Sequence, residues 1–371
     1  MNARRILLVG YYGKGNFGDD VLLKVSYNLL KQAMPDVDIS VIVDGDAGGY
    51  VPAMLGEVKV LEPARHGHFD LIVHGGGGVY FDFATHGLRN RLIENLLRFV
   101  GFPAYLTAEK FVRSISGKPR TSATVRVGLG IGVGTYSPGS PRLRASLPIL
   151  ADHDALWVRD VQSIENLKRF GAVLTGEIIP GSDLAFLTHY WLEKPVAPRV
   201  PAARPRLGII LRDWAQALGG LPEAALREVF VELARDHDIT GFVFDQHADP
   251  ELQRLLAPYA TCVWQPGTMK IDDFAERLAQ QDVLLTSRAH GAICGACVGV
   301  PSVIVAIEPK LQQVAAMLAN ACRVVPPQQP GQWAGALQEA RSIAPQAITA
   351  DVERNRAASI AALATIQRWL V

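Results

Sequence analysis

The sequence predicts an α/β protein of two domains, each built on a mostly parallel sheet. Short apolar runs alternate with longer helical patterns along the chain, which is typical of βα units. The chain has 371 residues, a length that suits two domains of roughly 150 to 190 residues better than a single core. A stretch with four prolines, residues 193–206, interrupts the alternation and predicts a linker.

The first half, residues 1–192, predicts the N-terminal domain. Its strand candidates are short and apolar and are followed by glycine or polar residues: Arg5–Val9, Ile39–Val43, Leu71–His74, Val125–Ile131 and Ala155–Val158. Helical patterns that would connect parallel strands occupy Asp19–Ala33, Gly87–Ser114, Pro141–Leu150 and Val161–Phe170.

The second half, residues 207–345, repeats the alternation and predicts the C-terminal domain. Its strand candidates are Leu207–Leu211, Gly241–Phe244, Cys262–Trp264, Val283–Thr286 and Ser302–Val305. The helices expected between them are Glu223–His237, Pro250–Ala257, Ile271–Gln280 and Ala289–Val298. The last segment, 346–371, predicts a long helix from about Ala347 to Trp369 that packs back toward the N-terminal domain.

Composition excludes several classes of function. The 37 basic and 36 acidic residues nearly cancel, so no global field favours nucleic acid or an anionic membrane. Four cysteines in a long chain do not predict a disulfide framework, and the cytoplasm is the expected compartment. Cys294 and Cys297 have the CxxC spacing, but their apolar surroundings favour buried thiols over a metal or redox pair.

The loop after the first strand contains a formal GxGxxG, Gly13–Gly18, and Asp44 lies where a ribose-binding acid is expected. This pattern makes a dinucleotide site one alternative. Asp19 and Asp20 weigh against it, because they place two negative charges at the helix start, where a pyrophosphate would bind. A role for Asp19 as helix cap and a role in a binding site are both compatible with this position.

Three further strand ends in the first half carry unusual residues. Four consecutive glycines, Gly75–Gly78, favour a loop whose backbone approaches a ligand, because glycine runs carry a high entropic cost. A similar run, Gly130–Gly134, follows the fourth strand. Arg159 and Asp160 follow the fifth, and this pair predicts either an internal ion pair or a direct contact with a ligand.

The most informative loop is Ser287–Gly291, after the strand Val283–Thr286. It places Arg288 and His290 at a helix N-terminus, where fixed positive charge, free backbone donors and a titratable side chain combine. These properties predict an anion site with a proton donor. Lys310, at the end of the neighbouring strand, is expected to supply a second cation.

In these motifs and their order, the sequence resembles the polysaccharide pyruvyl transferase family over nearly the whole chain. The motifs that carry the resemblance are Asn16–Asp20, Gly75–Gly78, Arg159–Ser163, Gly181–Ala185, Ser287–His290, Gly299–Pro301 and Glu308–Lys310. The resemblance implies a fold similar to that of GT-B glycosyltransferases, with two Rossmann-like domains facing across a cleft. One departure is Ile307, where the family often has an aromatic residue.

The resemblance also implies an activity and a set of roles. Pyruvate would pass from phosphoenolpyruvate, a substrate, to a sugar of a cell-surface polysaccharide or its lipid-linked precursor, with no metal or other cofactor required. The catalytic residues would be His290, as general acid, and Arg288; the donor would be bound by Arg288, Lys310, Ser287 and Gly291. The acceptor would be bound by Asn16, Asp19, Asp20, Gly75, Gly76, Gly77, Gly78 and Arg159. A lipid-linked acceptor would bring the enzyme to the inner face of the membrane.

Three alternatives stay open on the sequence alone. A GT-B glycosyltransferase would place Arg288 and Lys310 on a nucleotide diphosphate and Glu308 on its ribose. A nicotinamide-dependent dehydrogenase would use the Gly13–Gly18 loop, and a sugar-binding scaffold would use none of these residues for chemistry.

Overall fold

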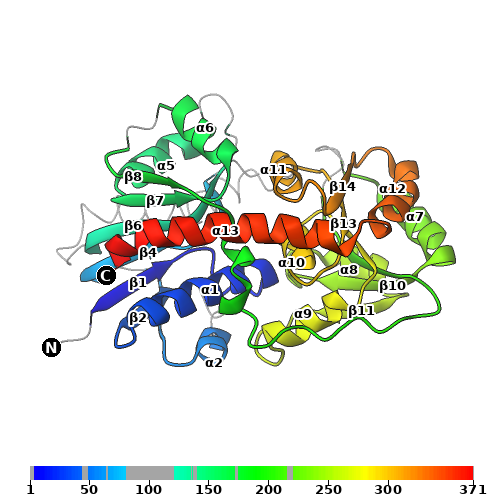
Figure 1. Cartoon of the computed structure of the whole chain (residues 1–371), viewed down its shortest axis with the longest axis horizontal. Helices are drawn as coiled ribbons and strands as arrows, with labels where there is room; N and C mark the ends of the chain where they lie inside the picture. Colours follow the sequence, from blue (N-terminus) through cyan, green and yellow to red (C-terminus); the bar gives the residue numbers. More distant parts are fainter. Residues whose placement is uncertain are drawn as a thin grey trace. The chain divides into compact units, whose positions relative to one another are not determined.

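The computed structural model of the protein describes residues 4–43, 49–63, 66–80, 121–134, 136, 140–171, 174–214 and 220–370 (Figure 1). The chain forms two compact units. Unit 1 consists of Met1–Lys14, Leu22–Leu184 and Ala358–Val371, and unit 2 of Gly15–Val21 and Ala185–Ala357. The helix expected at 87–114 and the acid expected at Asp44 lie outside the described residues.

Unit 1 is built on a parallel sheet with the strand order β3-β2-β1-β4-β6-β7-β8, and β5 pairs with β6. The strands are β1 (Arg5–Val9), β2 (Asp38–Ile42), β3 (Lys59–Leu61), β4 (His68–His74), β5 (Gly77–Tyr80), β6 (Ser122–Val133), β7 (Ala155–Val158) and β8 (Glu177–Pro180). The helices are α1 (Phe17–Ala33), whose first turn belongs to unit 2, α2 (Val51–Leu55), α5 (Pro141–Ala151) and α6 (Val161–Arg169). The segments Ile6–Val9 of β1 and Leu71–Val73 of β4 are continuously apolar and buried, as expected for strands covered on both faces.

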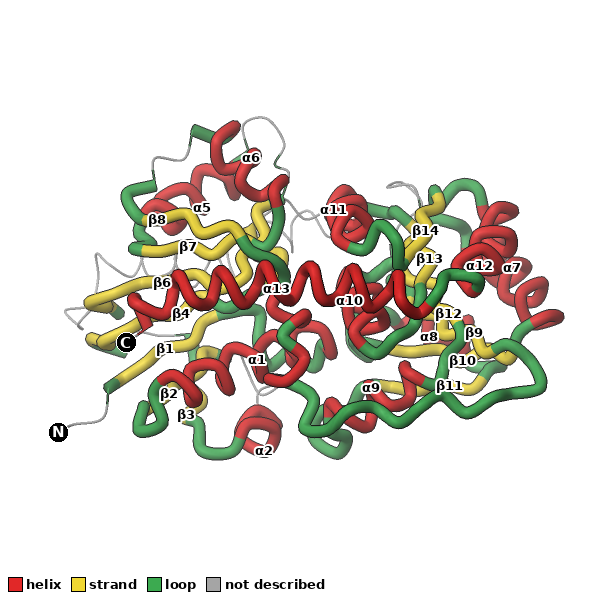
Figure 2. The backbone as a smooth tube through the Cα atoms, viewed as in Figure 1, coloured by secondary structure: helices red, strands yellow, loops and turns green. Residues whose placement is uncertain are grey.

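Unit 2 repeats this plan in the order β11-β10-β9-β12-β13-β14. The strands are β9 (Arg206–Ile210), β10 (Asp238–Val243), β11 (Ala260–Val263), β12 (Val283–Thr286), β13 (Ser302–Val305) and β14 (Cys322–Val325). The helices are α7 (Glu223–Asp236), α8 (Pro250–Leu256), α9 (Ile271–Ala279), α10 (Ala289–Cys297), α11 (Pro309–Met317), α12 (Trp333–Arg341) and α13 (Pro345–Leu370). Helices flank the strands of each sheet (Figure 2).

The strand order of each sheet reverses beside its first strand. The reversal lies between β1 and β4 in unit 1 and between β9 and β12 in unit 2, which is the arrangement of the Rossmann fold. Ligands of such sheets bind beyond the carboxyl ends of the strands at this reversal. Each unit therefore has one edge at which a site is expected.

The start of α1 packs into unit 2, which differs from the domain boundaries that the sequence predicts. The Phe17 ring lies 5.1 Å from Phe244, 5.2 Å from Trp264 and 4.4 Å from Phe274, measured between centroids. The Phe17 N–H also donates to the Phe244 carbonyl over 2.9 Å. These aromatic contacts assign Gly15–Val21 to unit 2 although the chain on either side belongs to unit 1.

The proline-rich stretch after Leu192 has no helix or strand until β9 begins at Arg206. It is attached to unit 2, where the Glu193 N–H donates to Asp272 Oδ1 over 2.8 Å and the Val200 N–H donates to Gln280 Oε1 over 3.0 Å.

The long C-terminal helix α13 is shared by both units. In unit 2, Asn355 Nδ2 donates to the Met317 carbonyl over 2.8 Å. In unit 1, Ser359 Oγ donates to the Asp183 carbonyl over 3.3 Å, and Arg368 forms an ion pair with Glu177. No helix among the described residues has the length and apolar character needed to cross a membrane.

Candidate active site

The loops after β9 and β12 meet at the edge of the unit 2 sheet where the strand order reverses. Arg212 follows β9 and Ser287 follows β12. The Arg212 N–H donates to Ser287 Oγ over 2.9 Å, and Ser287 is buried. The predicted donor-binding serine therefore holds the two loops together at the expected position for a site.

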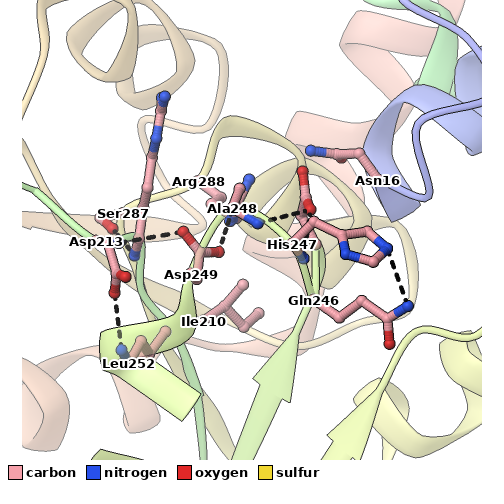
Figure 3. A network of polar contacts seen from close by, with 12 residues as sticks. Asn16, Ile210, Asp213, Gln246, His247, Ala248, Asp249, Leu252, Ser287 and Arg288 are labelled. Carbon is pink, nitrogen blue, oxygen red and sulfur yellow. Dashed lines mark hydrogen bonds and ion pairs between the residues drawn. The ribbon is translucent and has the colours of Figure 1, made fainter. Parts of the chain in front are cut away.

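Arg288 is the N-cap residue of α10, and its backbone is extended. Its N–H donates to Thr286 Oγ1 over 3.0 Å, and its guanidinium forms an ion pair with the carboxylate of Asp249 (Figure 3). The predicted cation is thus present at the strand end, but part of its charge is already compensated within the protein. Gly291 lets α10 begin close to β12, because a Cβ at this residue would lie 2.3 Å from Thr286 Oγ1.

A second group of charges lies at the end of β13. Glu308 Oε1 is 2.7 Å from Lys310 Nζ and 3.7 Å from Arg212 Nη1. Lys310 and Arg212 keep 23% and 32% of their side-chain surface exposed. Two cations therefore share one carboxylate and remain accessible to an anion. Ile307, the departure from the family pattern, packs against the apolar core of unit 2.

The predicted acid, His290, lies against the first turn of α1. A Cβ at Gly18 would fall 2.3 Å from His290 Nδ1 and 2.7 Å from its Cβ, so this close approach requires glycine. Asn16 Oδ1 accepts the Gly18 N–H over 3.0 Å. The side chain that caps α1 is therefore Asn16, which answers the question that the sequence left open about a capping role for Asp19.

Asp19 belongs to the same electrostatic group. Burial raises the pKa of the Asp19 carboxyl to about 6, whereas the positive charges of His290, Lys310 and Arg288 act against this rise. The negative charge of Asp245 raises the pKa further. Asp19 thus changes its charge near neutral pH, beside the residues that the sequence assigns to the donor.

Asp20 has a different environment from Asp19. Its side chain is buried, and its Oδ2 accepts a hydrogen bond from Trp264 Nε1 over 2.8 Å. This bond joins the aromatic contacts of Phe17 in attaching the first turn of α1 to unit 2. The structure gives Asp20 a role in holding this turn, while its predicted contact with the acceptor stays a prediction.

Of the four glycines predicted to form a loop, Gly75 and Gly76 follow β4, whereas Gly77 and Gly78 begin β5. At the first, a Cβ would fall 1.5 Å from the Tyr12 hydroxyl, and at the second it would fall 3.0 Å from Leu184 Cδ1. The third has a φ of 118°, a conformation that favours glycine. Packing and backbone conformation therefore account for three of these glycines, and their contact with an acceptor stays a prediction.

Arg159 is buried in unit 1 with 4% of its side chain exposed. Its Nε lies 3.1 Å from Asp160 Oδ2, and its Nη1 lies 3.6 Å from Asp183 Oδ2. A Cβ at Gly132 would lie 2.6 Å from Arg159 Nε, so the second glycine run accommodates the guanidinium. Of the two alternatives for Arg159 and Asp160, the internal ion pair is present.

A buried histidine pair precedes the glycine loop. His74 Nδ1 lies 2.7 Å from His153 Nε2, and His153 Nδ1 lies 2.9 Å from the Ile149 carbonyl oxygen. Burial lowers the pKa of His74 well below its usual value and that of His153 to about 4. Both rings are therefore neutral at physiological pH.

Three polar residues at the unit 2 edge were absent from the sequence prediction: Arg212, Asp245 and Asp249. Arg212 directly follows β9, the strand next to β12, while Asp245 and Asp249 lie in the loop after β10. Asp245 Oδ1 accepts the N–H groups of His247 and Ala248, each over 3.0 Å. The rule that selected Ser287–Gly291 would have found Arg212 and Asp245 if applied to every strand end.

The family model for polysaccharide pyruvyl transferase matches residues 16–309. The chain belongs to the polysaccharide pyruvyl transferase family. The match begins at the cap of α1 and ends at the start of α11, so it contains every predicted site residue except Lys310. Membership of this family supports a transferase that acts in polysaccharide biosynthesis.

Solved structures similar to this chain share its fold at low sequence identity. Sucrose-phosphate synthase from Thermosynechococcus elongatus has a TM-score of 0.57 and 13% identity, covering 99% of this chain and 98% of that one. The glycotransferase of kitacinnamycin has a TM-score of 0.54 and 14% identity, covering 100% of both chains.

The UDP-GlcNAc 2-epimerase from Methanocaldococcus jannaschii has a TM-score of 0.52 and 11% identity, covering 94% of this chain and 92% of that one. These neighbours and the two parallel sheets confirm the predicted GT-B-like fold class of two Rossmann-like domains. None of the curated protein sequences compared with the chain matches it.

Proposed function

We propose that the protein transfers pyruvate from phosphoenolpyruvate to two hydroxyls of a saccharide, forming a ketal and releasing phosphate. The observation that carries the proposal is the grouping of Arg288, His290 and Lys310 around the carboxyl end of one Rossmann-like sheet, in a chain of this family. Phosphoenolpyruvate has a carboxylate and a phosphate, so a site that binds it needs fixed positive charge.

The chemistry assigns a separate task to His290. Donation of its proton to the methylene carbon of phosphoenolpyruvate creates a cation at C2, which the first acceptor hydroxyl attacks. The bond between C2 and the phosphate oxygen then breaks, and the second hydroxyl completes the ketal. Of the two protons lost by the hydroxyls, one replaces the proton given to the methyl group and the other leaves with phosphate.

The cations stabilise charge that is present on the donor and grows on the leaving phosphate. Arg288 is held at the α10 N-terminus, where the helix dipole adds to its field. Lys310 and Arg212 extend from the neighbouring strand ends and share Glu308 between them. This arrangement supplies positive charge without a metal or other cofactor.

We assign an acceptor hydroxyl to Asp19. Asp19 is a carboxylate above pH 6, its pKa in the protein, and in that form it accepts the proton or the hydrogen bond of a sugar hydroxyl. The acceptor contacts predicted for Asn16, Asp20, Gly75–Gly78 and Arg159 stay predictions, because Asp20 and Arg159 are buried in contacts within the protein and Tyr12 lies against Gly75. For an acceptor carried on a lipid, the reaction takes place at the inner face of the membrane.

Thermal-shift measurements test the choice of donor. Phosphoenolpyruvate at 100 times its dissociation constant is expected to stabilise the protein by about 2.7 kcal/mol, and UDP, GDP and NADH are expected to give no shift. A shift with UDP or GDP alone favours a nucleotide-sugar glycosyltransferase, and one with NADH alone favours a dehydrogenase. Release of phosphate from phosphoenolpyruvate, assayed against a panel of free and lipid-linked sugars, then identifies the acceptor.

A further inference from the structure

Asp249 lies in the loop between β10 and α8, next to the donor-binding arginine. Its side chain is 1% exposed and forms the ion pair with Arg288 through Oδ2. Its other oxygen, Oδ1, accepts the N–H of Asp213 over 3.1 Å (Figure 3). Each oxygen of this carboxylate therefore contacts a different loop at the edge of the unit 2 sheet.

A second carboxylate, that of Asp213, holds the loop after β9 against the start of α8. Asp213 follows β9, and its Oδ2 accepts the N–H of Glu251 over 2.8 Å. Its Oδ1 accepts the N–H of Leu252 over 2.7 Å (Figure 3). These N–H groups belong to the first turn of α8, which has no partner for them within the helix. Asp213 thus caps α8 while its backbone holds Asp249.

Burial makes the ion pair between Asp249 and Arg288 energetically important. Burial raises the pKa of Asp249, and the Arg288 guanidinium opposes this by favouring the carboxylate. Arg288 Nε is also buried and has no hydrogen-bond partner among the residues that the structure describes. The Asp249 carboxylate forms an ion pair with this cation, and its loss would leave the largely buried guanidinium without that partner.

We propose that Asp249 is a positioning residue that fixes the Arg288 guanidinium in the orientation used for binding the donor. This inference rests on the proposed function, in which Arg288 binds phosphoenolpyruvate. A guanidinium has five donors in a rigid plane, so one ion pair to a fixed carboxylate determines where the remaining donors point. Glu308 stands in a similar relation to Lys310 and Arg212, but these three side chains are more exposed and less constrained.

The test uses Asp249→Asn, which keeps the shape and the Oδ1 acceptor but removes the charge. We expect kcat/KM for phosphoenolpyruvate to fall by about 10- to 100-fold, the range found when a residue that orients a metal ligand is replaced, because Asp249 orients Arg288 in a similar way. In the background of Arg288→Met the same substitution is expected to have less than about a twofold effect, because two residues that act through one interaction are not additive. Equal losses in both backgrounds would overturn the proposal.

Asp213→Asn is the matched control. It weakens the cap of α8 in the same network but leaves the Asp249 carboxylate and Arg288 in place. We expect it to lower the melting temperature, with an effect on kcat/KM that is the same with and without Arg288→Met. If Asp249→Asn and Asp213→Asn have similar melting temperatures, the larger fall in kcat/KM of Asp249→Asn is not caused by loss of folding.

A measurement without substrate separates this inference from the proposed function. In protein labelled with ¹⁵N-arginine, Arg288 signals are identified by their absence from Arg288→Met. We expect the wild-type Nη signals to show slow rotation of the guanidinium and the Asp249→Asn signals to show fast rotation. Fast rotation in the wild type overturns the positioning role whatever the substrate, whereas slow rotation in a protein that does not use phosphoenolpyruvate overturns only the proposed donor.

Discussion

The two sheets have the same strand order, but their carboxyl edges are filled differently. In unit 1 the Tyr12 ring, which follows β1, lies against Gly75 and is 2% exposed. In unit 2 the corresponding edge carries Arg212, His290 and Lys310, all of which remain partly exposed. The residues at a strand end in this fold can thus pack against the chain itself or present charged groups.

This difference gives the glycine runs of unit 1 a structural explanation. Glycine after a strand is commonly linked to close approach of a ligand. In unit 1 the space above Gly75 is taken by Tyr12, the space above Gly130 by Leu184 and that above Gly132 by Arg159. The glycines there make room for protein side chains.

The largest expected effect lies in unit 2. Replacement of His290 by alanine is expected to lower kcat for phosphate release by about 10²- to 10⁴-fold, the range for loss of a general acid. Steady-state kinetics with phosphoenolpyruvate and a saccharide acceptor measure this. The matched control is His247→Ala, because His247 is an exposed histidine at a neighbouring strand end of the same unit. Equal activity of the two variants would remove His290 from the mechanism.

In unit 1 the corresponding effect is expected on stability. Gly130 has a φ of 61°, and a Cβ there would lie 2.8 Å from Leu184 Cγ. Gly130→Ala combines backbone strain with overpacking, and we expect a loss of about 2–3 kcal/mol. Hydrogen exchange of the β6 amides measures it.

Gly171→Ala separates the two causes of that loss. Gly171 has a φ of 64°, and a Cβ there meets nothing within 4 Å. Its replacement carries only the backbone strain, about 1 kcal/mol. If both variants lose the same stability, the contact with Leu184 does not explain the glycine at 130.

The sequence predicted most of the sheet because its strands are short apolar runs between breakers. The ranges Arg5–Val9, Ala155–Val158, Val283–Thr286 and Ser302–Val305 agree with β1, β7, β12 and β13. Three of the four edge strands, β3, β8 and β14, were missed, since they bury less and carry weaker patterns, whereas the edge strand β11 was predicted in part as Cys262–Trp264. The exposed β3 (Lys59–Leu61) and the mixed β14 (Cys322–Val325) are examples.

Part of the site was also predictable from a local sequence pattern. Ser287–Gly291 stands out because a helix follows a buried strand and begins with arginine and histidine. The ion pair of Arg288 with Asp249 joins residues 39 apart in the chain, and no local pattern indicates it. The assignment of Gly15–Val21 to unit 2 also depends on long-range aromatic contacts, which a boundary drawn at the proline-rich stretch does not reveal.

A smaller effect on stability is expected for Asp19, because burying a charged group in a site often reduces the stability of the protein. Its folded pKa of about 6 lies above the reference value of 3.8, so the folded protein binds this proton more tightly than the unfolded chain. Its contribution therefore favours folding at pH 4 and is lost as the pH rises through 6. Asp19→Asn is expected to raise stability at pH 8 by about 1–2 kcal/mol and to change it little at pH 4.

Hydrogen exchange of the first α1 turn and of β12 at the two pH values measures this effect. Activity of the same variant is expected to lose the acid limb near pH 6, because the titrating carboxyl is gone. A variant that is less stable than the wild type at pH 8 would contradict the unfavourable burial of this charge.

The histidine pair of unit 1 is expected to give the smallest effect, with the opposite dependence on pH. The pKa of His153 is about 4 in the folded protein against a reference of 6.5, so the unfolded chain binds the proton more tightly. The contribution of His153 to the free energy of unfolding is therefore fully present above pH 6.5 and is lost as the pH falls toward 4. At pH 5.5 the loss from this residue is about 1 kcal/mol.

His153→Gln removes that titration, although it also lowers stability at every pH by altering the bonds to His74 and Ile149. The change in stability of β4 and β6 between pH 7.5 and 5.5, followed by hydrogen exchange, is expected to shrink by about 1 kcal/mol in the variant. The contributions of Asp19 and His153 therefore respond to the same pH change in opposite directions. An unchanged pH dependence in the variant would assign the acid sensitivity of unit 1 to other groups.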